Sequence, residues 1–182
     1  MRATGCFVLL VIIFFSANAQ KISFSEHRSS FHTYIKGDTF EGVVFSQDFA
    51  FPFLSHICGD KRFTPTPADI EAAEKLLIND LKTVNVLKLN QGGANGPVIH
   101  ENLNRFVRQY YGYVTETGDR IVYISFLFKG HYLPKNKETP NWLKGAVMVL
   151  NGGSNYWQIQ ANLDKLSLFG LGVNGLDRTA SR

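Results

Sequence analysis

Residues 64–84 read TPTPADIEAAEKLLINDLKTV, and this stretch decides the fold. Thr66 can cap a helix, Pro67 suits the first helical turn, and Asp69 stands where a capping-box acid belongs. Apolar residues then recur at spacings of three and four and form one stripe, made of Ile70, Ala73, Leu77, Leu81 and Val84. The stretch therefore predicts an amphipathic helix that lies across an apolar surface.

After this helix the hydrophobic pattern changes from a helical period to a period of two. A glycine-rich loop, residues 91–97, ends the helical part, and it lacks the lysine and hydroxyl of a phosphate-binding loop. Residues 106–115 and 120–129 are β-branched and aromatic runs, separated by the short polar segment 116–119. Because Gly118 in that segment tolerates positive φ, the pair is typical of a β-hairpin.

A second hairpin is expected from residues 145–150 and 156–163, around a tip at residues 151–155. One further extended segment, residues 166–173, follows it. A helix followed by an antiparallel meander can bury both apolar faces against each other. We therefore expect an α+β domain over residues 64–175, in which one helix packs on a curled antiparallel sheet of four to five strands.

Residues 1–19 carry the pattern of a secretory signal peptide. Arg2 gives a positive start, residues 7–15 form an unbroken apolar run, and Ala17-Asn18-Ala19 provides a small-residue cleavage site before Gln20. The run is shorter than a membrane span, so a retained anchor is the weaker interpretation. We therefore expect an exported protein, periplasmic or secreted, with no membrane insertion after cleavage.

Residues 20–63 are expected to form an N-terminal arm packed on the main domain. They are rich in phenylalanine, which argues against disorder: Phe24, Phe31, Phe40, Phe45, Phe49, Phe51, Phe53 and Phe63. The alternative is that these rings form a binding surface for a partner, and their burial distinguishes the two. At the other end of the chain, residues 176–182 are expected to be frayed.

Charge and cysteine content restrict the function further. Loss of Arg2 with the signal peptide leaves 18 basic and 15 acidic residues, a net charge of +3 that is too weak to indicate nucleic acid binding. Cys6 precedes the apolar run, whereas a lipoprotein cysteine would follow it. The one cysteine left, Cys58, cannot form an internal disulfide; it is a buried small residue, an intermolecular partner, or a nucleophile beside His56.

No constellation typical of an enzyme appears in the sequence. The five histidines lack metal-ligand spacing: His27, His32, His56, His100 and His131. Asp38, Asp48 and Asp60 are spread along the arm and do not form a carboxylate pair, and no Gly-x-Ser-x-Gly elbow occurs. We therefore expect a protein without catalytic activity, cofactor or metal.

The best candidate for a functional surface is the connection at residues 129–142. It is long for a link between strands and mixes cations with aromatic rings, as a site for glycans, other ring-bearing ligands, anionic ligands or a protein partner would. The candidate residues are Lys129, His131, Tyr132, Lys135 and Trp142. The alternative is a solvated loop whose Trp142 plugs the open end of the sheet.

A second candidate surface is the outer face of the first hairpin. Tyr110, Tyr111 and Tyr113 cluster there near Tyr123. Tyrosines on a sheet are more often engaged in cross-strand packing than in ligand contacts, so packing is the favoured interpretation.

The pattern of one helix followed by a curled sheet resembles the cystatin-like fold over residues 64–175. The segment GGSNYWQI at residues 152–159, with Asp164 and Asn174-Gly175, is similar to the layout of small exported proteins from Bacteroidetes-type bacteria. The cleavage region SANAQ, residues 16–20, is similar to theirs as well. Many of these proteins have no known activity, so the resemblance implies export and fold more than function.

The resemblance to cystatins also raises inhibition of proteases as an alternative to ligand binding. The inhibitory wedge would use the two hairpin tips, residues 116–119 and 151–155, which are expected to share one end of the sheet. The cystatin motifs themselves are only fragments here, because Gln109-Tyr110-Tyr111-Gly112 is one residue short and Pro140-Asn141-Trp142 separates its proline from its tryptophan. The leading hypothesis is therefore an exported, non-enzymatic protein that binds a ligand or partner.

Overall fold

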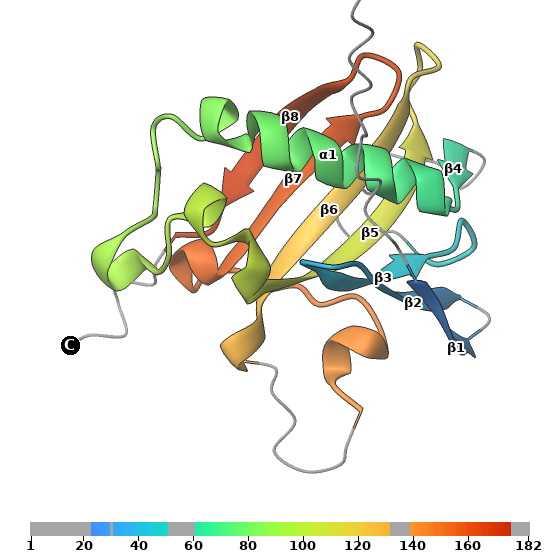
Figure 1. The fold of residues 1–182 in the computed structure, drawn as a ribbon, viewed down its shortest axis with the longest axis horizontal. Helices are drawn as coiled ribbons and strands as arrows, with labels where there is room; N and C mark the ends of the chain where they lie inside the picture. Colours follow the sequence, from blue (N-terminus) through green and yellow to red (C-terminus); the bar gives the residue numbers. More distant parts are fainter. Residues whose placement is uncertain (1–22, 30, 51–60, 132–138, 176–182) are drawn as a thin grey trace, which may run out of the picture.

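The computed structural model describes residues 23–29, 31–50, 61–131 and 139–175 (Figure 1). The predicted signal peptide, Cys58 and the C-terminal residues 176–182 lie outside these ranges. Among the residues that are described, no helix is both long enough and apolar enough to cross a bilayer.

The long helix, α1 (Pro67–Val84), begins where the sequence predicts. Its capping box is complete: the Asp69 backbone N–H donates to Thr66 Oγ1 at 3.3 Å, and the Thr66 backbone N–H donates to Asp69 Oδ2 at 2.8 Å. Four members of the predicted apolar stripe are buried, namely Ile70, Ala73, Leu77 and Leu81, whereas Val84 at the end of the helix is exposed. The stripe packs on the sheet, and α1 contacts β6, β7 and β8.

The helix lies on a mixed sheet. Seven strands follow one another across it in the order β1 (Ser23–Ser29), β2 (His32–Lys36), β3 (Glu41–Phe45), β5 (Phe106–Val114), β6 (Arg120–Phe128), β7 (Tyr156–Asn162) and β8 (Ser167–Val173). The short β4 (Arg62–Phe63) also pairs with β5. All neighbours are antiparallel except β3 and β5, which run parallel. The described part of the chain is therefore α+β, with one α-helix on one sheet.

The prediction of an antiparallel sheet of four to five strands was wrong in size and in direction. The described parts of the predicted arm supply β1 to β4, so this segment extends the sheet. Gly42 explains why β3 can join β5: a Cβ at this position would come within 2.6 Å of the Arg108 carbonyl oxygen. The chain reaches this parallel pairing only after passing through α1, and such a long-range contact leaves no local sequence pattern.

The first hairpin is confirmed, since β5 and β6 pair from Phe106 with Phe128 to Val114 with Arg120. Gly118 in its turn has φ +90°. The second hairpin was wrong, because residues 145–150 form no strand. β7 instead pairs directly with β6, with Ser125 opposite Gln158, and the last predicted segment pairs with β7 as β8. Residues 129–155 thus become one long connection.

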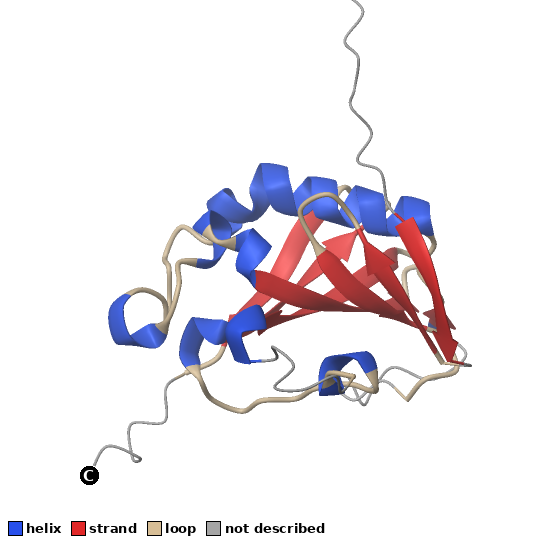
Figure 2. Ribbon diagram, turned by 60° about the horizontal axis from the view of Figure 1, so that its bottom comes forward, coloured by secondary structure: helices blue, strands red, loops and turns tan. Residues whose placement is uncertain are grey.

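The sheet carries an apolar cluster on each face. The inner face packs under α1, and its largest members include Phe106, Phe126 and Trp157. On the outer face lies a second cluster, in which Tyr111 and Tyr123 of the sheet meet Trp142 of the long connection. In Figure 2, α1 runs along one face of the sheet and a short helical turn of the connection lies along the other. We call residues 139–150 the covering loop.

Candidate functional site

One buried side chain fastens the covering loop to the outer face of the sheet. Gln109 of β5 is fully buried, and its Nε2 donates to the carbonyl oxygens of Trp142 at 2.9 Å and Gly145 at 2.8 Å. Its Oε1 accepts from the Val147 backbone N–H at 2.9 Å. The amide therefore makes three hydrogen bonds to one loop, which accounts for a polar side chain at this depth.

A second amide holds the far end of the connection. Asn174, just after β8, donates from Nδ2 to the carbonyl oxygens of Val149 at 2.5 Å and Asn151 at 3.3 Å. Its backbone N–H also donates to the Tyr156 carbonyl oxygen at 3.1 Å. Met148 lies between the two anchors and Leu150 within the second, and these side chains are 54% and 87% exposed. The loop is thus held at several points and presents apolar side chains beside them.

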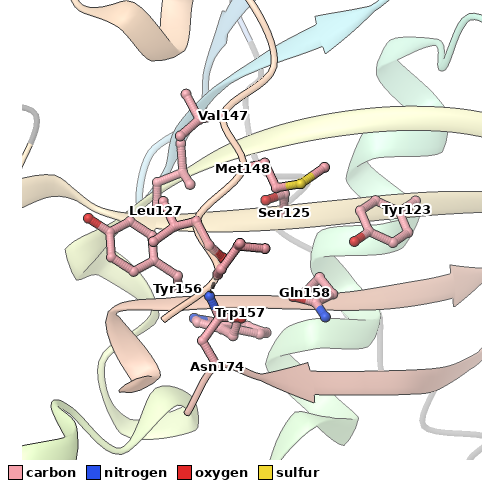
Figure 3. A pocket seen from close by; sticks show the side chains of 11 residues that line it. Tyr123, Ser125, Leu127, Val147, Met148, Tyr156, Trp157, Gln158 and Asn174 are labelled. Atoms are coloured by element: carbon pink, nitrogen blue, oxygen red, sulfur yellow. Dashed lines mark hydrogen bonds between the residues drawn. The ribbon is translucent and has the colours of Figure 1, made fainter. Parts of the chain in front are cut away.

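A pocket of about 310 Å³ lies between this loop and the outer face of β6 and β7 (Figure 3). Its polar floor is made by Ser125 and Gln158, which face each other in the register of the two strands. Tyr123 and Tyr156 form aromatic walls. The remaining lining is apolar or belongs to the rim: Leu127, Val147, Met148, Val149, Leu150, Trp157 and Asn174. No described residue that lines this pocket carries a charged side chain.

The side chains of the floor have hydrogen-bonding groups without a partner in the part of the chain that the structure describes. Neither the Ser125 hydroxyl nor the Gln158 amide hydrogen-bonds to another described residue. The Gln158 side chain lies across β8 at Gly172, where a Cβ would come within 2.3 Å of its Nε2. The absence of a side chain at Gly172 therefore provides the space that the Gln158 amide occupies. A pocket with a few convergent polar groups and apolar walls is the usual form of a small-molecule site.

The two tyrosine walls have different surroundings. Burial raises the pKa of Tyr123, so its phenol stays protonated. The Tyr156 hydroxyl lies 2.9 Å from His131 Nδ1, and the ring centroids of these two residues are 5.7 Å apart. The His131 ring also packs against Phe128, with 5.2 Å between centroids. His131 is thereby placed at the edge of the pocket through Tyr156.

The other described residues of the predicted surface, Lys129 and Trp142, contact other parts of the structure. Lys129 pairs with Glu41 of β3, with 3.1 Å between Nζ and Oε1. Trp142 is only 4% exposed and packs in the outer-face cluster, where its ring centroid is 6.2 Å from that of Tyr34. Trp142 is thus buried against the outer face of the sheet, whereas the alternative interpretation placed it at the sheet's open end. Tyr132 and Lys135 lie outside the described residues.

The tyrosine cluster of the first hairpin is divided between the two faces. Tyr111 stacks on Phe45 on the outer face, with 4.7 Å between parallel rings, and lies 6.1 Å from Tyr123. Tyr110 points to the inner face, where its hydroxyl donates to Glu74 at 2.7 Å. The buried tyrosines therefore serve packing, and of the four only Tyr123 lines the outer pocket.

The two segments of the proposed inhibitory wedge lie at opposite ends of the sheet. The tip at residues 116–119 follows the pairing of Val114 with Arg120, whereas residues 151–155 precede Tyr156, which pairs with Leu127 at the other end of β6. The expectation that they share one end was wrong, because the strand at 145–150 does not exist. Residues 151–155 instead dock on the glycine-rich loop, where Ser154 Oγ donates to the carbonyl oxygens of Asn95 and Pro97.

Sequence reasoning missed Ser125, Gln158 and Asn174 as site residues. Gln158 stands at one of the polar positions that alternate with apolar ones along residues 156–163, and such alternation usually indicates a face turned to solvent. The signal that could have found the pocket is the run of polar residues at one register level of three neighbouring strands. No group of three or more His, Cys, Asp or Glu side chains in the described part of the chain could hold a metal ion.

Comparisons with protein families, with curated proteins and with solved structures find no match to this chain. Its function must therefore be argued from the geometry of its own residues.

Proposed function

We propose that this is an exported, non-enzymatic protein that binds an uncharged ligand in the outer-face pocket. The observation that carries the proposal is the floor of that pocket, where the Ser125 hydroxyl and the Gln158 amide make no hydrogen bond to another described residue. Polar groups in a partly enclosed site favour a ligand that satisfies them. The tyrosine walls favour a ligand with a ring face.

The described residues that line the pocket carry no charge, and this distinguishes between two of the ligand classes that the sequence left open, glycans and anionic ligands. An anionic ligand would lose its hydration in this pocket without gaining a cation, which is costly. A neutral sugar ring offers hydroxyl groups for the floor and an apolar C–H face for Tyr123 or Tyr156. We therefore favour a glycan over an anionic ligand.

The proposal also includes that the protein is exported and that its fold is related to the cystatin-like fold. Export is supported by the composition of residues 1–19, and a glycan ligand suits a protein that works outside the cytoplasm. The single helix across a curved sheet supports a relationship with the cystatin-like fold, while the parallel pairing of β3 with β5 is an addition to the simple meander. A relationship of fold would not by itself imply protease inhibition.

The test is ligand-observed NMR and calorimetry on the mature chain, beginning at Gln20, against a panel of neutral mono- and disaccharides. Ser125→Val and Gln158→Leu should each weaken binding about tenfold, because each removes a hydrogen bond worth about 1.4 kcal/mol. Ser167→Val is the matched control, since Ser167 is exposed on β8 and does not line the pocket. Failure of every neutral probe, or unchanged binding by both pocket variants, would contradict the proposal.

A further inference from the structure

A second pocket, of about 280 Å³, opens beside α1 on the inner face of the sheet. It lies on the side opposite the outer pocket, because Arg108 and Gln109 are neighbours in β5 and point to opposite faces. Its base is made by Glu74 of α1 and Arg108 of β5, and Ile78, Leu103 and Asn104 are among the residues around it.

The two charged residues at the base form a buried ion pair. Arg108 Nε lies 3.0 Å from Glu74 Oε1, and the two residues are 1% and 2% exposed. The Tyr110 hydroxyl donates to the same oxygen of Glu74 at 2.7 Å, and Arg108 Nη1 donates to the Phe106 carbonyl oxygen at 2.8 Å. These contacts fix both side chains in one orientation.

Each residue of this pair nevertheless has one side-chain atom that makes no hydrogen bond to another described residue. Glu74 Oε2 and Arg108 Nη2 make no hydrogen bond to any other described residue. Neither atom is among the fully enclosed ones, and both residues line the pocket. The base of the pocket therefore holds an acceptor and a donor that are available to a ligand, on side chains fixed by the rest of the ion pair.

The charges around this pair restrict the ligand. Glu74 and Arg108 neutralise each other, so a singly charged ligand at the base would meet a like charge as well as an opposite one. His100 lines the same pocket, and its Nδ1 accepts from Asn85 Nδ2 at 2.9 Å. Burial lowers the pKa of His100, so it adds no positive charge. Glu101 at the rim is already paired with Lys88 at 3.2 Å.

We propose that this inner pocket is a second binding site, for a small neutral polyol such as a monosaccharide. One hydroxyl donates to Glu74 Oε2, and the neighbouring hydroxyl accepts from Arg108 Nη2. Two adjacent hydroxyl groups suit this base because each can rotate to donate or accept as needed. Ile78 and Leu103 supply apolar contact for the C–H face of the molecule.

A purely structural role for the ion pair is the alternative. The pair joins α1 to β5, and a buried ion pair contributes little net stability while its disruption is costly. Substitution of Glu74 or Arg108 would therefore confuse loss of binding with loss of folding. The experiment must block the pocket and leave the pair intact.

Ile78→Trp does this, because Ile78 is exposed at the pocket and a larger ring there fills the entrance. Asn79→Trp is the matched control: it places the same ring one residue further along α1, at an exposed position that does not line the pocket. The probes are glucose, galactose, mannose and glycerol at millimolar concentration, with acetate and ethanolamine as charged comparisons.

Binding is followed by the ¹⁵N resonance of Arg108 Nε–H in the mature chain and by calorimetry. A neutral polyol should shift this resonance, Ile78→Trp should weaken binding at least about tenfold, and Asn79→Trp should leave it within about twofold. The proposal is overturned if no polyol moves the resonance, if both tryptophan variants behave alike, or if a charged probe binds better. Loss of binding in Ser125→Val or Gln158→Leu, with Ile78→Trp unaffected, would assign the ligand to the outer pocket and leave the proposed function standing.

Discussion

Replacing Gln109 with leucine would remove the side chain that fastens the covering loop, residues 139–150, to the sheet. The change deletes the hydrogen bonds to Trp142 O, Gly145 O and Val147 N. Each such bond contributes about 1 kcal/mol net, so their joint loss should lower the free energy of unfolding by about 3 kcal/mol. For a domain of this length the melting temperature should fall by about 6–12 °C.

Gln158→Leu is the matched control for this experiment. It removes the same amide from the same face and register level, two strands away, but the Gln158 side-chain amide makes no hydrogen bond to another described residue. Its effect on the free energy of unfolding should stay within about 0.5 kcal/mol. Urea denaturation followed by circular dichroism compares the two variants directly.

A local readout shows whether the loop itself has been released. The chain has two tryptophans, so a Trp157→Phe background leaves Trp142 as the only tryptophan, which can be excited selectively. In that background Gln109→Leu should shift the Trp142 emission to longer wavelength and speed proteolytic cleavage within residues 139–150, because the ring loses its cover. Equal stability of the two leucine variants, or an unchanged Trp142 emission, would refute the anchoring role of Gln109.

Two further predictions concern the backbone and the helix cap. Gly42→Ala should lower the free energy of unfolding by at least about 2 kcal/mol in urea denaturation, because the added Cβ would lie 2.6 Å from a backbone oxygen of β5. Gly145→Ala is the control and should be nearly neutral, since nothing lies within 4 Å of its Cβ. Equal effects of the two substitutions would contradict the close approach. The pKa of Asp69 is lowered, since hydrogen bonds from Thr66 and the nearby Arg120 outweigh the opposing effect of burial. The unfolding free energy of the wild type should therefore exceed that of Asp69→Asn by its full amount above about pH 4, and this difference should disappear as the pH falls through the lowered pKa. A difference that stays constant in urea denaturation from about pH 7 to about pH 2 would argue against this.

The parts of the fold that the sequence predicts correctly are those specified by neighbouring residues. The cap at Thr66 and Asp69 and the spacing of the apolar stripe act within α1, and Gly118 acts within one turn. Such signals do not depend on the rest of the chain. The helix and the first hairpin could therefore be placed before any contact between distant segments was known.

The errors concern segments whose partners are distant in the sequence. Residues 145–150 are a short apolar run, and such a run suits a strand or a loop that covers an apolar face equally well. Strand β3 pairs in parallel with β5, and paired residues such as Gly42 and Arg108 are 66 positions apart in the sequence. Gly42 is the one local sign of this close approach among the residues of β3. Of the predicted site residues that are described, only His131 reaches the edge of the outer pocket, because Trp142 is used to bury the face of the sheet.

The position of the outer pocket follows from one row of polar residues across the sheet. Gln109, Ser125 and Gln158 stand at the same register level on three neighbouring strands, and Gly172 continues the row on β8. The rows on either side are mainly aromatic or apolar. The covering loop is hydrogen-bonded to this row at Gln109, whose amide makes three hydrogen bonds to the loop. Ser125 and Gln158 are left with unused hydrogen-bonding groups where that cover ends, so the same polar row that anchors the loop also supplies the floor of the site.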